Sequence, residues 1–166
     1  MIFAITNRHL LEREDLLERV EFCLRSGIEF IMLREKDYDD TSLLALAQEV
    51  KALTDRYGGY LIINNNLKVA RSVEAYGVQL SMEAIHEGIE FSGKIGASVH
   101  SYDEARKAIR CGVDYLLTSH IFPTECKPGL KAKGIELIQS IRTASSIKII
   151  ALNAMYIALL RNGLQT

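Results

Sequence analysis

The chain has 166 residues, of which 48% are hydrophobic and 25% are charged, and its formal net charge is −1. This composition is that of one globular domain with a sizeable core. The near-neutral charge excludes the basic surface of a nucleic-acid-binding protein, although a few local cations suffice for a small anionic ligand. With no apolar run of membrane-spanning length and no secretory signal, we expect a cytoplasmic protein that binds neither nucleic acid nor membrane.

Short apolar runs alternate with amphipathic stretches of helical length. The apolar runs are too short and too uniformly apolar for half-exposed strands and are typical of a parallel sheet that is buried on both faces. Strands are predicted at 2–5, 28–33, 60–63, 77–80, 94–97, 113–117 and 147–152, and helices at 12–26, 41–57, 67–75, after Ser101, at 135–143 and at 154–161.

The strict alternation predicts an α/β fold, and seven units favour a TIM (β/α)8 barrel over an open sheet. The segment Thr6-Asn7-Arg8-His9 follows the first strand where a dinucleotide-binding fold would carry glycines. A barrel closes with eight strands, so residues 1–166 are expected to form a single barrel domain that lacks the eighth strand and the C-terminal helix. We expect a longer polypeptide, and the unpaired edges favour a homo-oligomer.

Polar residues follow the predicted strands at their carboxyl ends, which meet at one rim of a barrel. They include cations, amides and hydroxyls, a set that suits a phosphorylated small molecule. No carboxylate cluster is present, so no metal site is predicted. The residues of this rim that we take as candidates are Arg34, Lys36, Asn64, Gln79, Ser98, His100, His120, Thr124 and Lys127.

His100 is the best candidate for a catalytic group, because imidazole exchanges protons near neutral pH. Each candidate also has a structural interpretation. The triplet Arg34-Glu35-Lys36 fits a solvated turn, the asparagines at 64–66 fit a helix N-cap, and His120 fits a structural role. The residues alone leave these alternatives open.

Five ordered motifs resemble the thiamine-phosphate synthase superfamily, which includes the TenI-type thiazole tautomerases. They are Leu-Arg-Glu-Lys at 33–36, Leu-Ile-Ile-Asn at 61–64, Gly-Val-Gln-Leu at 77–80, Gly-Ala-Ser-Val-His-Ser at 96–101 and Phe-Pro-Thr-Glu-Cys-Lys at 122–127. The family fold is a (β/α)8 barrel. Within the family, the synthase couples hydroxymethylpyrimidine diphosphate to thiazole phosphate and needs Mg²⁺ held by two aspartates.

The aspartate positions of the synthase hold Asn65 and Ala84 here, and neither offers a charged oxygen ligand. The TenI-type pattern is closer at Gln79, around His100 and over 120–130. The resemblance therefore implies thiamine biosynthesis by metal-independent tautomerisation of carboxythiazole phosphate to its aromatic form, with His100 as general acid/base and no cofactor. It further implies that the anionic substrate is held by Arg34, Lys36 and Lys127 and is oriented or bound by Asn64, Gln79, Ser98, His120 and Thr124.

Two alternatives accompany this prediction. One is thiamine-phosphate synthase itself, with Mg²⁺ as its cofactor. The other is a non-catalytic regulatory protein that binds thiazole phosphates. The Gly-Gly pair that holds phosphate in the family after the seventh strand is absent at Leu152-Asn153, which is expected to weaken phosphate binding if the chain is complete.

Overall fold

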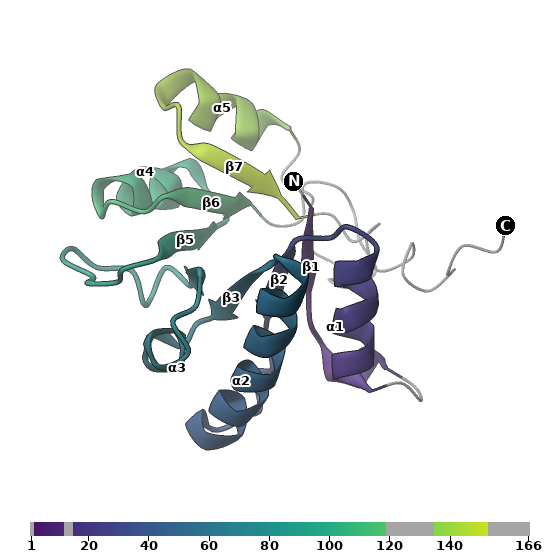
Figure 1. Cartoon of the computed structure of the whole chain (residues 1–166). Helices are drawn as coiled ribbons and strands as arrows, with labels where there is room; N and C mark the ends of the chain where they lie inside the picture. Colours follow the sequence, from purple (N-terminus) through teal and green to yellow (C-terminus); the bar gives the residue numbers. More distant parts are fainter. Residues whose placement is uncertain (1, 12–14, 119–134, 153–166) are drawn as a thin grey trace, which may run out of the picture. The chain divides into compact units, whose positions relative to one another are not determined.

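A computed structural model describes residues 2–11, 15–118 and 135–152 of the chain (Figure 1). Its seven described strands are parallel and lie in one sheet in the order of the sequence, β1 to β7. The described residues fall into two compact units. One contains the residues up to Leu80 together with Glu90–Ile95, and the other contains Ser81–Ile89 and the residues from Gly96 onward.

The first unit begins the alternation of strands and helices. Its strands β2 and β3 are the centre of its core, where Ile31, Leu33, Ile62 and Ile63 are fully buried. In Figure 1, α1 and α2 lie side by side, and they pack against each other. The elements are β1 (Phe3–Ile5), the 3-10 helix η1 (Arg8–Leu10), α1 (Leu16–Arg25), β2 (Phe30–Leu33), α2 (Asp40–Tyr57), β3 (Tyr60–Asn64), α3 (Leu67–Ser72) and β4 (Gly77–Leu80).

Local signals explain where α2 begins and ends. Asp39 is its N-cap and accepts a hydrogen bond from the backbone N–H of Ser42 at 2.8 Å. Gly58 ends the helix in the left-handed conformation, with φ of 68°, which glycine adopts without steric cost. The helix thus starts one residue before the predicted boundary, because aspartate caps it from position 39.

Aromatic rings stack across the amino-terminal ends of the strands in the same unit. Phe3, Phe30 and Tyr60 are in register on β1, β2 and β3. The centroids of Phe3 and Phe30 are 4.9 Å apart, and those of Phe30 and Tyr60 are 4.8 Å apart. These contacts stabilise the end of the sheet opposite to the predicted rim.

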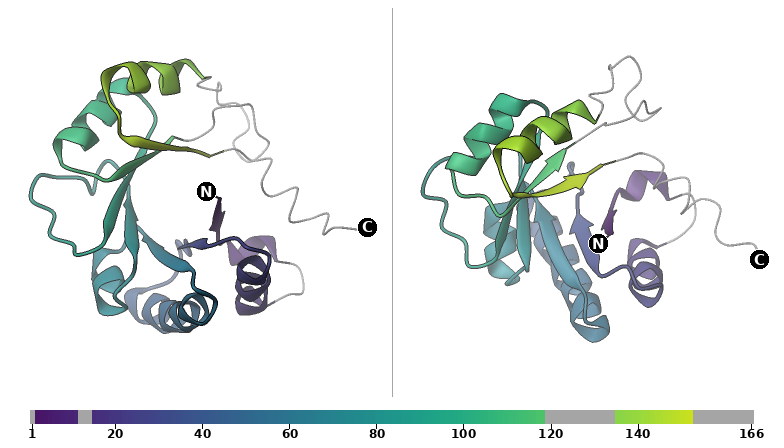
Figure 2. Two further views of the ribbon diagram at one scale, coloured as in Figure 1. Left: turned by 45° about the horizontal axis from the view of Figure 1, so that its top comes forward. Right: turned by 90° about the horizontal axis from the view of Figure 1, so that it is seen from above.

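The second unit continues the alternation, and Figure 2 shows α4 and α5 beside each other in both views. Its strand β6 is buried at every position. Ser101 caps α4 by accepting a hydrogen bond from the Glu104 backbone N–H at 3.2 Å, as the sequence predicts. The elements are β5 (Lys94–Val99, which begins in the first unit), α4 (Tyr102–Arg110), β6 (Tyr115–Thr118), α5 (Glu136–Ala144) and β7 (Lys148–Ala151).

The predicted parallel α/β alternation is confirmed for all seven strands. Strand β5 extends to Val99, so Ser98 lies within the strand rather than beyond its end. Helix α3 ends at Ser72 instead of position 75. The predicted helix at 154–161 and the region of an eighth strand lie outside the described residues. No helix among the described residues is long and apolar enough to span a membrane.

Candidate active site

The loop after β2 is organised around a buried carboxylate. Glu35 is 5% exposed, so the alternative of a solvated turn at 34–36 is wrong for this residue. Its Oε1 accepts a hydrogen bond from the Thr6 hydroxyl at 2.7 Å. The backbone N–H of Arg8 donates to both carboxylate oxygens, at 3.3 and 3.2 Å, and Arg8 Nη1 donates to Oε2 at 3.2 Å. A buried carboxylate requires this degree of compensation.

Arg8 also binds the next acidic residue of the loop. Its Nη1 donates to Asp37 Oδ1 at 2.6 Å, and its Nη2 pairs with Asp37 Oδ2. The hydrogen bonds from Arg8 hold the pKa of Asp37 well below its usual range, and the Arg8 pKa is raised in return. The guanidinium lies 4.3 Å from the ring centroid of Tyr38, a cation–π geometry. One arginine after β1 thus fixes the conformation of the loop after β2.

The two cations of this loop lie next to the carboxylates that Arg8 binds. The backbone N–H of Arg34 donates to Thr6 Oγ1 at 2.9 Å. The Arg34 side chain is half-buried and that of Lys36 is exposed. Within residues 2–11, 15–118 and 135–152, neither cation forms an ion pair with a carboxylate. They are therefore suited to an anionic ligand.

The three asparagines at 64–66 have three different roles. Asn64 is paired in register with Gln79, and its Nδ2 lies 3.5 Å from the Gln79 carbonyl oxygen. Asn65 adopts a positive φ of 53°, and its N–H donates to the same carbonyl at 2.7 Å. Asn66 is the N-cap of α3 and accepts from the Val69 N–H at 2.9 Å. The N-cap interpretation is thus confirmed for Asn66. Asn64 is instead the last residue of β3 and is paired with Gln79 of β4, which is fully buried.

His100 is held by the carboxylate of Glu104 in the second unit. It follows β5 directly, and its backbone N–H donates to Glu104 Oε2 at 2.6 Å. The same oxygen lies 3.4 Å from His100 Nδ1. Because Glu104 is fixed in the first turn of α4 by Ser101, it holds both the backbone and the ring of the histidine. A carboxylate on one ring nitrogen orients the other for proton exchange.

A second carboxylate lies near this histidine. A hydrogen bond with the Ser81 side chain lowers the pKa of Glu83, and the positive charges of His100 and Lys107 lower it further. Ser98 is half-buried within β5. Two carboxylates, those of Glu104 and Glu83, therefore lie near His100.

The resemblance assigns the two metal-binding aspartates of the synthase to the positions of Asn65 and Ala84. Asn65 offers a neutral amide oxygen and Ala84 offers no ligand atom, whereas Mg²⁺ sites in proteins use carboxylates. Among the residues that the structure describes, no three or more His, Cys, Asp or Glu side chains gather as a metal site would require.

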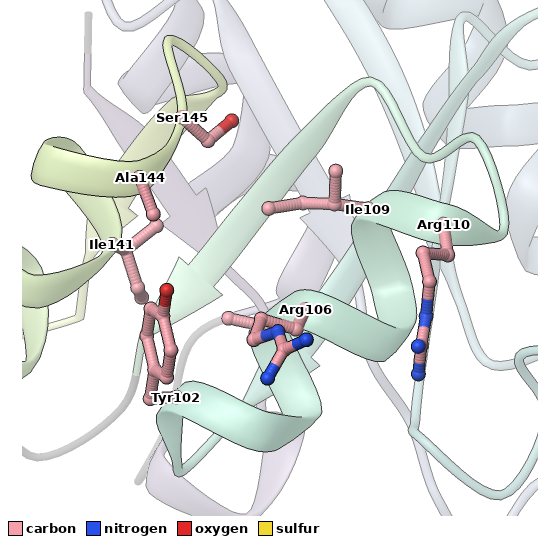
Figure 3. A pocket seen from close by; sticks show the side chains of 8 residues that line it. Tyr102, Arg106, Ile109, Arg110, Ile141, Ala144 and Ser145 are labelled. Carbon is pink, nitrogen blue, oxygen red and sulfur yellow. The ribbon is translucent and has the colours of Figure 1, made fainter.

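The structure does not describe the third predicted group of residues, since His120, Thr124 and Lys127 lie outside the described ranges. A groove of about 270 Å³ lies between α4 and α5 (Figure 3). It is lined by Tyr102, Ile109 and Ile141 among others. None of the predicted site residues that the structure describes lines this groove.

The sequence-based prediction missed Arg8 and Glu104 as site residues. Arg8 is recognisable only in retrospect, as a cation after β1 with two acidic residues after β2. Glu104 carried a signal, because Ser101-x-x-Glu104 is a capping box, but its contact with His100 follows from the fold.

Comparison with known proteins identifies the family of this chain. A family model described as thiamine monophosphate synthase matches residues 2–159. A thiamine-phosphate synthase of Caldanaerobacter subterraneus is 31% identical over 93% of this chain and 74% of the relative, and one of Clostridium botulinum is 35% identical over 93% and 78%.

Solved structures agree with this assignment. The thiamine phosphate pyrophosphorylase of Pyrococcus furiosus superposes with a TM-score of 0.80 at 28% identity, covering 98% of this chain and 81% of that one. Parallel strands in chain order, polar residues at their carboxyl ends and a family match along almost the whole chain lead to one conclusion: the chain belongs to the thiamine monophosphate synthase (TMP-TENI) family.

Proposed function

We propose that this chain tautomerises carboxythiazole phosphate to its aromatic form in thiamine biosynthesis, without a metal. The observation that supports the proposal is the position of the Glu104 carboxylate beside His100. Glu104 Oε2 lies 2.6 Å from the His100 backbone nitrogen and 3.4 Å from His100 Nδ1. An oriented imidazole near neutral pH supplies general acid/base catalysis.

The proposed chemistry is a proton relocation within one substrate. His100 accepts a proton from one position of the thiazole and returns a proton at another, so no atom is gained or lost. Aromatisation of the ring supplies the driving force. The enzyme must then hold the anion and orient the ring, which suits the cations Arg34 and Lys36 and the amides of Asn64 and Gln79.

The remaining predicted residues complete the proposal. Ser98 lies within β5 two residues before His100 and is assigned to substrate binding. His120, Thr124 and Lys127, which lie outside the described residues, are assigned to the same role from the sequence. Lys127 adds a third cation for the substrate anion.

A second candidate function is coupling of hydroxymethylpyrimidine diphosphate to thiazole phosphate. The relatives at 31% and 35% identity are thiamine-phosphate synthases, which favours this reaction over tautomerisation. Asn65 and Ala84 count against it, because the coupling reaction of the family needs Mg²⁺ on carboxylates at these positions.

The test compares histidine variants in both reactions. His100→Gln and His100→Ala are assayed beside His86→Gln, a matched control since His86 is an exposed histidine of the same unit. General acid/base catalysis contributes roughly 10²–10⁴-fold, so both His100 variants are expected to lose tautomerisation by about that factor while the His86 variant keeps it. His120→Gln is assayed in parallel.

The outcomes separate the candidates. Full tautomerase activity in the His100 variants would overturn the catalytic role of His100. Loss of tautomerisation in His120→Gln alone would move that role to His120. Binding of the thiazole phosphate by the wild-type chain without turnover in either reaction would favour a non-catalytic binding protein.

A further inference from the structure

The Arg8 side chain binds Glu35 and Asp37 and lies against the ring of Tyr38, and the proposed function gives it no role. We propose that Arg8 binds the two acidic neighbours of Arg34 and Lys36 and thereby keeps these two cations available for the anionic group of the substrate. The inference rests on the proposed function in that it takes Arg34 and Lys36 as the anion-binding residues. Arg8 is then a positioning residue, which acts through the loop after β2.

The order of charges in this loop creates the need for such a residue. Arg34, Glu35, Lys36 and Asp37 alternate in sign. Cations and carboxylates that adjoin along the chain attract one another, and a carboxylate beside each cation weakens its field for an incoming anion. The pattern alone therefore predicts a loop that is close to neutral.

The third cation changes this balance. Arg8 Nη1 donates to both Glu35 and Asp37, and its Nη2 also pairs with Asp37. One guanidinium thus hydrogen-bonds both carboxylates of the loop from the segment that follows β1. Among the described residues, Arg34 and Lys36 pair with neither carboxylate.

Geometry keeps the arrangement in place. Thr6 Oγ1 donates to Glu35 and accepts from the Arg34 N–H, at 2.7 and 2.9 Å. Glu35, at 5% exposure, has its carboxylate directed to Thr6 and Arg8, away from solvent where it would meet an anion. Arg8 is further steadied by the ring of Tyr38 at 4.3 Å. The backbone of the loop after β2 is therefore set by hydrogen bonds with the residues that follow β1.

Titration with inorganic phosphate tests the inference directly, with the amide NMR signals of residues 34–36 as the reporter. Thr6→Val removes the hydroxyl at almost constant shape, and Thr6→Ser retains it. Loss of the hydrogen bonds that Thr6 provides is expected to weaken phosphate binding in Thr6→Val by about tenfold, whereas Thr6→Ser stays within about twofold of the wild type.

A second pair of variants tests the charge argument. Arg8→Gln removes the guanidinium from both carboxylates and is expected to weaken phosphate binding about tenfold, and Arg8→Gln/Asp37→Asn is expected to recover about threefold of this loss. The control is Asp55→Asn, which removes a carboxylate from the exposed ion pair Lys51–Asp55 on α2 of the same unit. A merely structural role for Arg8 predicts no recovery in the double variant.

The phosphate titrations test the inference about Arg8 independently of the proposed function. Equal phosphate affinity in Arg8→Gln and the wild type would overturn it, and so would the absence of phosphate-dependent shifts at 34–36 in the wild type. If Arg8→Gln fails to fold, equal phosphate affinity in Thr6→Val and the wild type would overturn it, because Thr6 holds Glu35, one of the two carboxylates that Arg8 binds. The expected pattern in a chain without tautomerase turnover would support the inference and refute the proposed function. In an active chain, Thr6→Val is expected to raise KM more than it lowers kcat.

Discussion

Replacement of Glu104 by glutamine tests whether the Glu104 carboxylate orients His100. The carboxylate accepts the His100 N–H at 2.6 Å and lies in the first turn of α4. A hydrogen bond to a charged acceptor contributes roughly 1.5–3 kcal/mol and a neutral one about 1 kcal/mol. Because the side chains of His100 and Glu104 are 44% and 37% exposed, solvent screening reduces the difference, and we expect a loss of about 1 kcal/mol in the free energy of unfolding.

The effect on turnover is expected to exceed the effect on stability. A less firmly oriented ring spends less time in the reactive geometry, so kcat should fall by about tenfold with little change in KM. Urea denaturation and steady-state kinetics measure the two effects. Asp103→Asn is the matched control, since Asp103 is an exposed carboxylate in the same helical turn. A Glu104→Gln enzyme with wild-type kcat, or an equal loss in Asp103→Asn, would refute the reasoning.

Three further predictions follow from the described contacts. Hydrogen bonds from Ser42 lower the pKa of Asp39, so its stabilising effect is present above the unfolded value of about 3.9 and is lost as the pH falls through the lower folded value. Asp39→Asn, which retains an N-cap, should therefore lose less stability on acidification in urea titrations from pH 6 to pH 2; parallel curves would contradict this. Asn65→Asp restores a carboxylate at a position whose positive φ aspartate tolerates and should bind Mg²⁺ more tightly than the wild type in calorimetry, whereas equal binding would show that this position is not a metal site. Gly93→Ala would place a Cβ 2.6 Å from the Tyr76 carbonyl oxygen and should cost about 1–3 kcal/mol of unfolding free energy; unchanged urea midpoints would contradict the packing.

Much of the fold could be predicted because its signals are local. Buried parallel strands are uniformly apolar, as Phe30–Leu33 in β2 shows with four buried positions. The cap at Ser101 is likewise encoded within four residues, and α4 begins where the sequence indicates. The ends of strands depend on pairing with distant segments. Strand β5 continues through Ser98 to Val99, because hydrogen bonds to β6 prolong it.

The candidate site was only partly predictable, because its decisive contacts join distant segments. Glu35 lies in a charged tetrapeptide that resembles a surface turn, yet it is buried by Thr6 and Arg8, which are 29 and 27 residues away in the sequence. Nothing in the local pattern of residues 34–37 indicates that Thr6 and Arg8 are the partners of Glu35. The carboxyl ends of parallel strands gave the correct general location of Arg34, Asn64 and His100, but not the residues that hold them.

The most direct test of the central proposal is turnover of the non-aromatic carboxythiazole phosphate tautomer by the full-length protein in the presence of a metal chelator. Metal-independent tautomerisation predicts formation of the aromatic product at an undiminished rate, with loss of this activity in His100→Ala. Turnover that appears only with Mg²⁺ and hydroxymethylpyrimidine diphosphate, with release of pyrophosphate, would contradict the proposed function and establish the coupling reaction instead.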